Sequence, residues 1–361
     1  MNHLERFHQR LVSSGPTGFL ETVLFLLLVP LSVLYGSLMW VRSLLYRVNL
    51  FRVTSATIPV ISVGNLAVGG TGKTPFVDYL LAYFSARGIR PAVISRGYGG
   101  RFSGNVGVVC AGNGPLMPPE QCGDEPYLLA QKHPGAQVLI ASRRRDAIRH
   151  LAATAKVDLI ILDDAFQHLS VARDLNIVLL DAARPFGNGF PLPAGLLREF
   201  PVALRRADLL VMTRAETIDN HPGRFALPTV ACRHHLSRTL RTLGGETTEL
   251  DSLVNKRGVA FAGIANPPAF FAGLLAEGLQ LFEQVAFADH AAYGAREFER
   301  LAALGDSADY FITTEKDAVK LADLPFTKPC YIVSLELKLL QDEALAEKLV
   351  EICREVKHGV E

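Results

Sequence analysis

The glycine-rich stretch VGNLAVGGTGKTPFV, residues 63–77, constrains the fold of this chain more than any other segment. It follows the apolar run VISVG and precedes a helical pattern, which is the setting of a phosphate-binding loop. The strict pattern G-x-x-x-x-G-K-[ST] requires a glycine where this chain has Ala67. Alanine can replace glycine wherever the backbone φ is negative, so we expect the loop to keep its N–H donors. The stretch predicts binding of a nucleoside triphosphate.

Each position of the loop has an expected task. The loop backbone and the start of the following helix direct N–H groups and a positive dipole end at phosphate oxygens. The backbone donors expected to cradle the phosphates belong to Gly69, Gly70, Thr71 and Gly72. Lys73 is expected to reach the β- and γ-phosphates, and the Thr74 hydroxyl to bind Mg²⁺.

A phosphate loop of this kind needs an acidic residue at the end of a neighbouring strand to hold the magnesium ion. The run LIILDD ends in Asp163 and Asp164. We expect this pair to bind Mg²⁺ together with Thr74, and the sequence leaves open which carboxylate touches the metal. GTP-specific proteins usually carry N-K-x-D, and the N-K at residues 255–256 lacks the Asp. ATP is therefore the preferred nucleotide.

Short apolar runs alternate with helical patterns along the rest of the chain. The runs are apolar throughout, which is typical of strands buried on both faces of a parallel sheet. The pattern predicts an α/β fold: a P-loop NTPase-type doubly wound sheet, a second, smaller α/β domain and an N-terminal hydrophobic membrane helix. The expected divisions are a membrane anchor at 1–50, a P-loop core at 51–215, a β-rich linker at 216–256 and a C-terminal α/β domain at 257–361.

The segment Thr22–Val41 contains no charged residue. As a helix, 20 residues rise about 30 Å, the thickness of a bilayer's hydrocarbon core. We interpret it as a membrane anchor; a buried core helix is the alternative, and the sequence does not decide whether the anchor spans the bilayer or lies in one leaflet. Arg42, Arg47 and Arg52 follow it and slightly favour a cytoplasmic location for the bulk of the chain.

Composition excludes two classes of protein. A net charge of +1 argues against nucleic acid as the main partner, because phosphate backbones require a basic excess. The five cysteines form no C-x-x-C pair, which argues against a disulfide framework or a zinc knuckle and is typical of a reducing cytosol.

Further motifs occur in a characteristic order after the loop. They are SRGYGG (95–100), GDEP (123–126), LDDAFQH (162–168), LLDAARPFGNGFPLPAGLLRE (179–199), FADHAAY (287–293) and TTEKDAVKL (313–321). Over nearly its whole length the chain resembles the tetraacyldisaccharide 4'-kinases, the lipid A kinases of Gram-negative bacteria. Ala165 departs from the family, which usually has glycine there. Ala67 does not depart from the family, because the family's loop also lacks a glycine at this position.

The resemblance implies transfer of the γ-phosphoryl group of ATP, with Mg²⁺, to the 4'-hydroxyl of an acylated glucosamine disaccharide 1-phosphate. It implies a kinase at the inner (cytoplasmic) membrane, with its catalytic domains on the cytoplasmic face. The expected partners are the lipid substrate and the bilayer, with no nucleic acid and no obligate protein partner.

Two residues are candidates for the acid–base chemistry. A sugar hydroxyl is a weak nucleophile, so a positioned base should accept its proton. Asp124 in GDEP is the candidate base, and the resemblance pairs it with His290 of FADH. On sequence alone Asp124 could equally be a helix N-cap before Pro126, and His290 an ordinary loop histidine.

Six residues are weaker candidates for contact with the substrate, each with a structural alternative such as loop packing, a helix start or a surface ion pair. They are Tyr98, Arg144, Gln167, His168, Arg198 and Glu199. Two other functions remain open at this point. The chain could be a membrane-docked ATPase switch, or a non-enzymatic nucleotide-binding subunit, although neither explains the Asp124 and His290 motifs.

Overall fold

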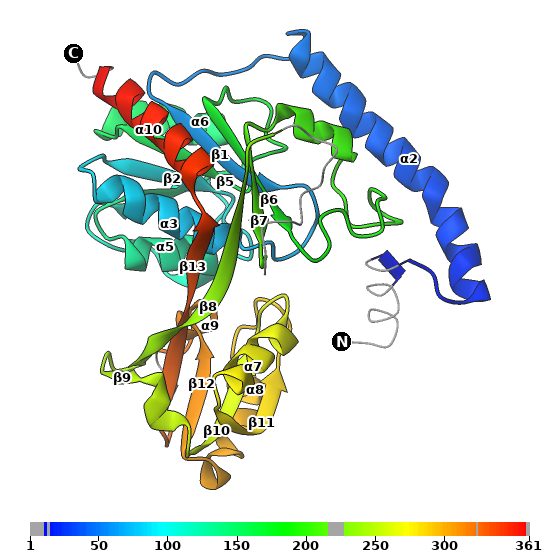
Figure 1. Ribbon diagram of the computed structural model, residues 1–361. Coiled ribbons are helices and arrows are strands. Elements are labelled where there is room, and N and C mark those ends of the chain that lie inside the picture. The colour runs from blue at the N-terminus through cyan, green and yellow to red at the C-terminus, as the bar shows by residue number, and fades with distance from the viewer. Residues whose placement is uncertain (1–10, 13–14, 216–226, 323, 359–361) are drawn as a thin grey trace.

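The computed structural model describes residues 11–12, 15–215, 227–322 and 324–358, and shows two lobes with a long helix along one side of the larger (Figure 1). Residues 216–226, the expected start of the linker, lie outside the described residues. The described strands form one sheet with the order β11-β10-β12-β13-β8-β7-β6-β1-β5-β2-β4-β3, and β9 pairs with β8.

The larger lobe contains the strands predicted from the apolar runs. They are β1 (Val60–Asn65), β2 (Pro91–Ser95), β4 (Gln137–Ile140), β5 (Leu159–Asp163), β6 (Leu175–Asp181) and β7 (Leu209–Thr213). These strands are parallel, whereas β3 (Gly107–Ala111), which the sequence did not predict, pairs antiparallel with β4 at the edge. The helices of this lobe are α3 (Lys73–Ser85), α4 (Pro119–Cys122), α5 (Asp124–Lys132), α6 (Arg144–Thr154) and the 3-10 helix η1 (Pro201–Arg206).

The smaller lobe contains the other end of this sheet. Its elements are β9 (Thr247–Glu249), η2 (Leu250–Leu253), β10 (Arg257–Ala262), α7 (Pro267–Ala276), β11 (Gln280–Ala286), α8 (Ala295–Ala302), η3 (Gly305–Ser307), β12 (Tyr310–Thr314) and α9 (Glu315–Ala318). Strand β10 is parallel to both β11 and β12. The α/β fold class with a mostly parallel sheet is confirmed.

Two long strands connect the lobes (Figure 1). β8 (Thr229–Thr242) pairs parallel with β7 at its start and then antiparallel with β13 (Cys330–Gln341), which in turn pairs with β12. After β13 the chain returns to the larger lobe as α10 (Glu343–His358). The buried Leu345 and Leu349 of α10 join the same core cluster as Phe76 of α3. The end of the segment 257–361 thus packs with the larger lobe.

The position of Ala67 has a structural reason. It forms a bridge with Leu197, and the neighbouring Val68 N–H donates to the Leu196 carbonyl at 2.8 Å. Ala67 does not take a positive φ, so its methyl group causes no strain. The phosphate loop is therefore attached at its entrance to the segment that follows β6.

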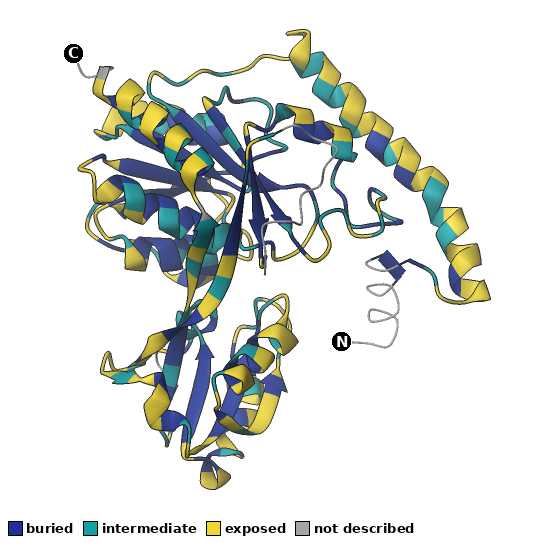
Figure 2. Ribbon diagram, viewed as in Figure 1, coloured by how far each residue is buried: buried dark blue, intermediate teal, exposed yellow. Residues whose placement is uncertain are grey.

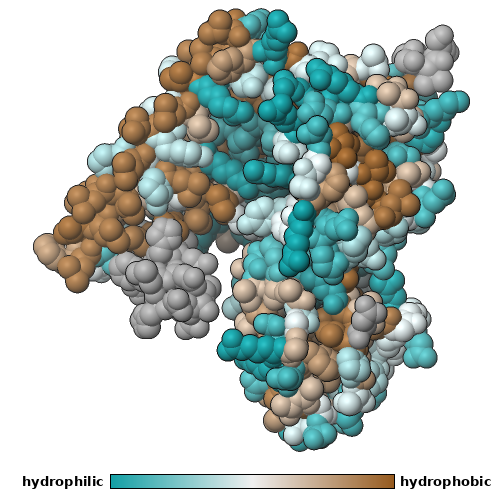
Figure 3. Space-filling view, turned by 180° about the vertical axis from the view of Figure 1, so that it is seen from behind, coloured by the Kyte–Doolittle hydropathy of each residue, from teal (hydrophilic) through white to brown (hydrophobic). Residues whose placement is uncertain are grey.

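Helix α2 (Phe19–Arg47) is long and apolar enough to cross a membrane, and little of it is buried by the protein (Figure 2). In Figure 3 the apolar side chains of α2 form a band along one side of the molecule, while most of the other surface in this view is hydrophilic. The alternative of a buried core helix is wrong, because side chains such as Leu27 and Leu34 are more than half exposed.

One narrow stripe of α2 docks on the larger lobe. Phe25 packs edge-on against Phe190, with ring centroids 5.3 Å apart. Ser32 donates a hydrogen bond to the Pro191 carbonyl, and its oxygen accepts one from the Ala194 N–H, each at 2.7 Å. Arg206 donates to the Ser43 hydroxyl at 2.9 Å. The contacts recur after about two and three turns, so one face of the helix meets the protein and most of the remaining apolar side chains stay exposed.

We expect enlargement of Gly36 to undock α2, because a Cβ at this position would overlap the Phe200 ring. Gly36→Leu should cost about 1–3 kcal/mol, the usual cost of overpacking. The measurement is thermal unfolding in detergent micelles together with limited proteolysis of residues 48–59. Leu34→Phe enlarges the exposed face of the same helix and should change neither. Equal protease sensitivity in the two variants would show that the stripe does not hold the helix.

Candidate active site

The phosphate loop lies at the carboxyl end of β1, and its backbone is held by side chains that the sequence did not single out. Asn65 donates to the Thr71 hydroxyl at 3.0 Å and to the Gly69 carbonyl at 3.4 Å. Arg214 donates to the Gly70 carbonyl at 2.8 Å and pairs with Asp181. The signal for Asn65 was a polar residue ending a buried apolar strand.

The loop glycines carry the conformations that a phosphate cradle needs. Gly69 and Gly72 have φ values of +122° and +78°, and Gly72 is the N-cap of α3. Helix α3 begins at Lys73, followed by Thr74, so both side chains stand at the positive end of the helix. The predicted loop residues Gly69, Gly70, Thr71, Gly72, Lys73 and Thr74 therefore lie together as one turn.

The two carboxylates at the end of β5 differ in their partners. The Ser95 hydroxyl donates to Asp163 Oδ2 at 3.0 Å, whereas the buried Oδ1 has no hydrogen-bond partner among the described residues. Burial, with Glu125 and Asp164 nearby, raises the pKa of Asp163 to about 6. A cation bound at Oδ1 would stabilise the ionised form of the Asp163 carboxylate.

Asp164 is already paired. Arg198 donates to both of its oxygens, at 2.9 and 3.0 Å, and Lys73 Nζ lies 3.5 Å away. Burial alone would raise the pKa of Asp164, but Lys73 and Arg198 hold it below its usual value. Its φ of +49° turns the chain sharply after β5. The adjacent Ala165 is fully buried and its N–H donates to the Val63 carbonyl, so the turn accommodates the methyl group.

Asp124 and His290 come from different lobes and meet at 2.9 Å, between Oδ2 and Nδ1. Asp124 is the first residue of α5, whose N-cap is Gly123, and its side chain makes no capping bond. The N-cap interpretation of Asp124 is therefore wrong. Lys320 Nζ also lies 2.9 Å from Oδ2. Burial would raise the pKa of Asp124, but hydrogen bonds from His290 and Lys320 hold it below its usual value.

The 95–100 segment connects the acidic pair with Asp124 and His290. Ser95 bonds Asp163, and three residues later the exposed Tyr98 ring lies edge-on to the His290 ring, with centroids 5.2 Å apart. On the other side of the acidic pair, Gln167 donates to the Asn65 carbonyl at 3.0 Å and accepts from Arg198 at 3.4 Å. The candidates Tyr98, Gln167 and Arg198 thus surround one region.

Two of the weaker candidates, Arg144 and Glu199, are buried in the scaffold, whereas His168 is partly exposed. Arg144 is only 1% exposed and donates to the Ala141 carbonyl at 2.5 Å and the Asp163 carbonyl at 2.9 Å. Glu199 is 4% exposed and forms a bidentate pair with Arg206 at 2.9 Å. Burial and the nearby Arg144 lower the pKa of His168 to about 4, so its ring is neutral. In this conformation neither Arg144 nor Glu199 is available to a substrate.

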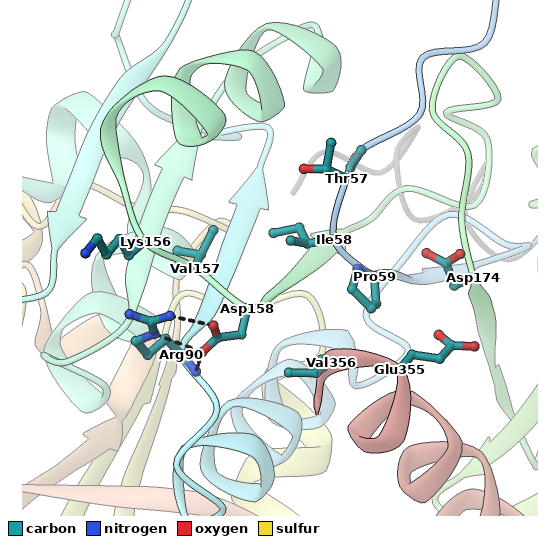
Figure 4. A pocket seen from close by; sticks show the side chains of 11 residues that line it. Thr57, Ile58, Pro59, Arg90, Lys156, Val157, Asp158, Asp174, Glu355 and Val356 are labelled. Atoms are coloured by element: carbon teal, nitrogen blue, oxygen red, sulfur yellow. Dashed lines mark hydrogen bonds and ion pairs between the residues drawn. The ribbon is translucent and has the colours of Figure 1, made fainter. Parts of the chain in front are cut away.

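A cavity of about 480 Å³ lies at the opposite end of the strands (Figure 4). It is bounded by residues just before β1, β2, β5 and β6, including an exposed pair between Arg90 and Asp158, and by Glu355 of α10. Doubly wound sheets bind ligands at the carboxyl ends of their strands. The candidate site is therefore the loop edge, and the cavity is separate from it.

Comparison with known proteins agrees with this geometry. The family model described as Tetraacyldisaccharide-1-P 4'-kinase matches residues 24–354. The chain belongs to this family. The tetraacyldisaccharide 4'-kinase of Syntrophotalea carbinolica is 49% identical over 97% of this chain and 98% of its own, and that of Geobacter metallireducens is 45% identical over 90% and 97%.

A solved member of the 4'-kinase family has the same fold. The crystal structure of LpxK from Aquifex aeolicus in complex with ATP superimposes with a TM-score of 0.77 and 31% identity. The alignment covers 91% of this chain and 99% of that chain. This chain is therefore a tetraacyldisaccharide 4'-kinase of lipid A biosynthesis with the P-loop kinase fold, and it carries an N-terminal apolar helix.

We expect Arg144→Met to destabilise the fold, because it removes the donors to two buried carbonyls, that of Ala141 just after β4 and that of Asp163 at the end of β5. Loss of these hydrogen bonds to a charged donor should lower the free energy of unfolding by roughly 2–4 kcal/mol. Denaturant unfolding measures this, and the exposed Arg143→Met is the control. A stable Arg144→Met protein with a raised KM for the lipid would instead show a substrate contact.

Proposed function

We propose that this chain transfers the γ-phosphoryl group of ATP to the 4'-hydroxyl of a tetraacylated glucosamine disaccharide 1-phosphate. One observation carries the proposal in this chain: a base, Asp124, held by His290 of the other lobe, lies on the same edge as a complete phosphate loop. Family membership supplies the acceptor.

The loop would bind the nucleotide phosphates. The backbone N–H groups of residues 69–72 and the start of α3 would contact their oxygens, and Lys73 would neutralise charge on the transferred group. In the structure Lys73 lies beside Asp164, which Arg198 also holds. This pairing keeps the ammonium group at the loop before a phosphate arrives.

The residues present suit a magnesium ion. Asp163 Oδ1 is a buried oxygen with no hydrogen-bond partner among the described residues, and Thr74 lies in the first turn of the neighbouring helix α3. Mg²⁺ usually binds through one or two carboxylates together with substrate phosphates, which this edge can supply. We assign the direct contact to Asp163 and Thr74, and a supporting role to Asp164 because Arg198 occupies it. When bound, the ion would neutralise charge on the phosphates.

Asp124 would act on the acceptor hydroxyl. As the hydroxyl oxygen bonds to the γ-phosphorus, its proton passes to the Asp124 carboxylate and the bond from the γ-phosphorus to the bridging oxygen breaks, releasing ADP. The candidates Tyr98, Gln167, His168 and Arg198 would contact the sugar. Arg144 and Glu199 would support this region from within the scaffold.

The two lobes would have separate tasks. The P-loop kinase core at 51–215 would hold the nucleotide, and the domain at 257–361 would contribute His290. The linker at 216–256 contains β8, so bending of the strands that join the lobes would open and close the site.

The anchor would place this site at the bilayer. The docked stripe of α2 extends from Phe25 to Ser43, about 27 Å of helix. If α2 crossed the bilayer, the largely irregular segment 186–206, with its charged residues Arg198, Glu199, Arg205 and Arg206, would lie in hydrocarbon. We therefore propose that α2 lies along one leaflet, on the cytoplasmic face of the inner membrane, where the acyl chains of the acceptor remain in the lipid.

The activity is tested with purified protein in detergent micelles, Mg-ATP labelled at the γ-position and the tetraacylated disaccharide 1-phosphate. The wild type should label the lipid. Asp124→Asn and Lys73→Ala should each lower kcat by about 100-fold or more, because one loses the base and the other a phosphate contact. Lys348→Met on the surface of α10 is the control. ATP binding without labelled lipid would favour the ATPase switch or the non-enzymatic subunit.

The depth of α2 is tested by tryptophan quenching with brominated lipids, since Trp40 is the single tryptophan in the sequence. Leu27→Trp and Leu34→Trp, each with Trp40→Phe, move the probe along the exposed face. A helix within one leaflet should give similar depths for all three positions. Depths that change by about 20 Å from residue 27 to residue 40 would show a spanning helix.

A further inference from the structure

Two lysines of the smaller lobe reach the Asp124–His290 pair. Lys320 Nζ lies 2.9 Å from Asp124 Oδ2, and Lys316 Nζ lies 3.3 Å from His290 Nε2. We propose that Lys316 and Lys320 are positioning residues of the phosphoryl transfer, which hold Asp124 as a carboxylate with one free oxygen and His290 in a single tautomer. The inference rests on the proposed function, and it concerns how the base is prepared.

Lys316 determines where the proton of His290 resides. A lysine ammonium group has three donors and no acceptor, so its contact with Nε2 is a hydrogen bond only if Nε2 carries a lone pair. The imidazole is then neutral with its proton on Nδ1, and Nδ1 donates to Asp124 Oδ2 at 2.9 Å. Glu125 at 3.5 Å and Asp289 at 3.2 Å hold the Lys316 ammonium group in place.

Lys320 completes the environment of the carboxylate. Its side chain is 8% exposed and that of Asp124 is 9% exposed, so the two charges are shielded from water together. Both donors, His290 and Lys320, use Oδ2. Oδ1 receives no hydrogen bond from the part of the chain that the structure describes, and it is left for the acceptor hydroxyl.

If their role were purely structural, Lys316 and Lys320 would only hold the two lobes together. Another ion pair already serves that purpose without touching Asp124 or His290: Lys132 of α5 lies 3.2 Å from Glu315 of α9. Lys132 also pairs with Asp78 of α3 at 2.6 Å. Lys132→Met is therefore a matched control that removes a charge contact between the lobes and leaves the base untouched.

The pH dependence of the base follows from the groups around it. The ionisable groups near Asp124 are Cys122 of α4, Glu125 of α5, and His290, Tyr293, Lys316 and Lys320 of the smaller lobe. Removal of the positive charge of Lys320 raises the pKa of Asp124. The carboxylate is then protonated at a higher pH, so activity is lost sooner as the pH falls.

The first experiment measures kcat/KM for the lipid acceptor as a function of pH at saturating Mg-ATP. In Lys320→Met the acid limb should move upward by about one to three pH units, the usual effect of one opposite charge. Lys320→Arg keeps the charge and should keep the wild-type limb. Lys132→Met should also keep it, even if kcat falls.

Nucleotide affinity and thermal unfolding, measured on the same proteins, separate this effect from misfolding. An acid limb in Lys320→Met that matches the wild type would overturn the role of Lys320. An equal shift of the acid limb in Lys132→Met would also overturn it, because the limb would then report closure of the lobes and not protonation of Asp124.

The second experiment does not need activity. Protein labelled with ¹⁵N-histidine, with His290→Gln to assign the signal, should show His290 protonated on Nδ1 and unprotonated on Nε2. Lys316→Met should lose this single tautomer, and Lys316→Arg should restore it. A proton on Nε2 in the wild type would refute the role of Lys316. If the wild type fails to label lipid, the proposed function fails, while the tautomer result still stands or falls by itself.

Discussion

A parallel sheet brings the carboxyl ends of its strands to one edge, and the site depends on this constraint. The phosphate loop follows β1, the acidic pair ends β5, and the 95–100 segment follows β2. Because β2, β5 and β1 are neighbours in the sheet, residues about 100 positions apart in the chain share one region. The same geometry explains why Ser95 reaches Asp163.

Asp124 and the groups that hold it come from different lobes. The larger lobe supplies Asp124, and the smaller lobe supplies His290 and Lys320 to meet it. Such a buried ion pair is a weak source of stability, since desolvation offsets much of the attraction. Its value lies in specificity: Asp124 Oδ2 receives hydrogen bonds from both His290 and Lys320 only when the lobes are together. The smaller lobe thereby connects lobe closure with the state of the base.

Helix α2 has two environments along its whole length. The docked stripe uses close packing at Gly36 and hydrogen bonds at Ser32, while most of the apolar side chains on the other faces are exposed. The same segment that receives α2 also pairs with the entrance of the phosphate loop at Ala67. Helix α2 and the entrance of the phosphate loop are thus joined through the segment 186–206.

The sequence by itself determined the α/β class, the phosphate loop, the acidic pair and the apolar helix, because each depends on local pattern: glycine spacing, uninterrupted apolar runs and the lack of charge. It also placed Asp124 and His290 as candidates through resemblance. Only the tertiary structure decided that Asp124 is no N-cap, that Arg144 and Glu199 are buried in the scaffold, and that Lys316 and Lys320 join the base. The physical reason is that hydrogen-bond partners and burial depend on contacts between residues far apart in the chain, which local pattern does not encode.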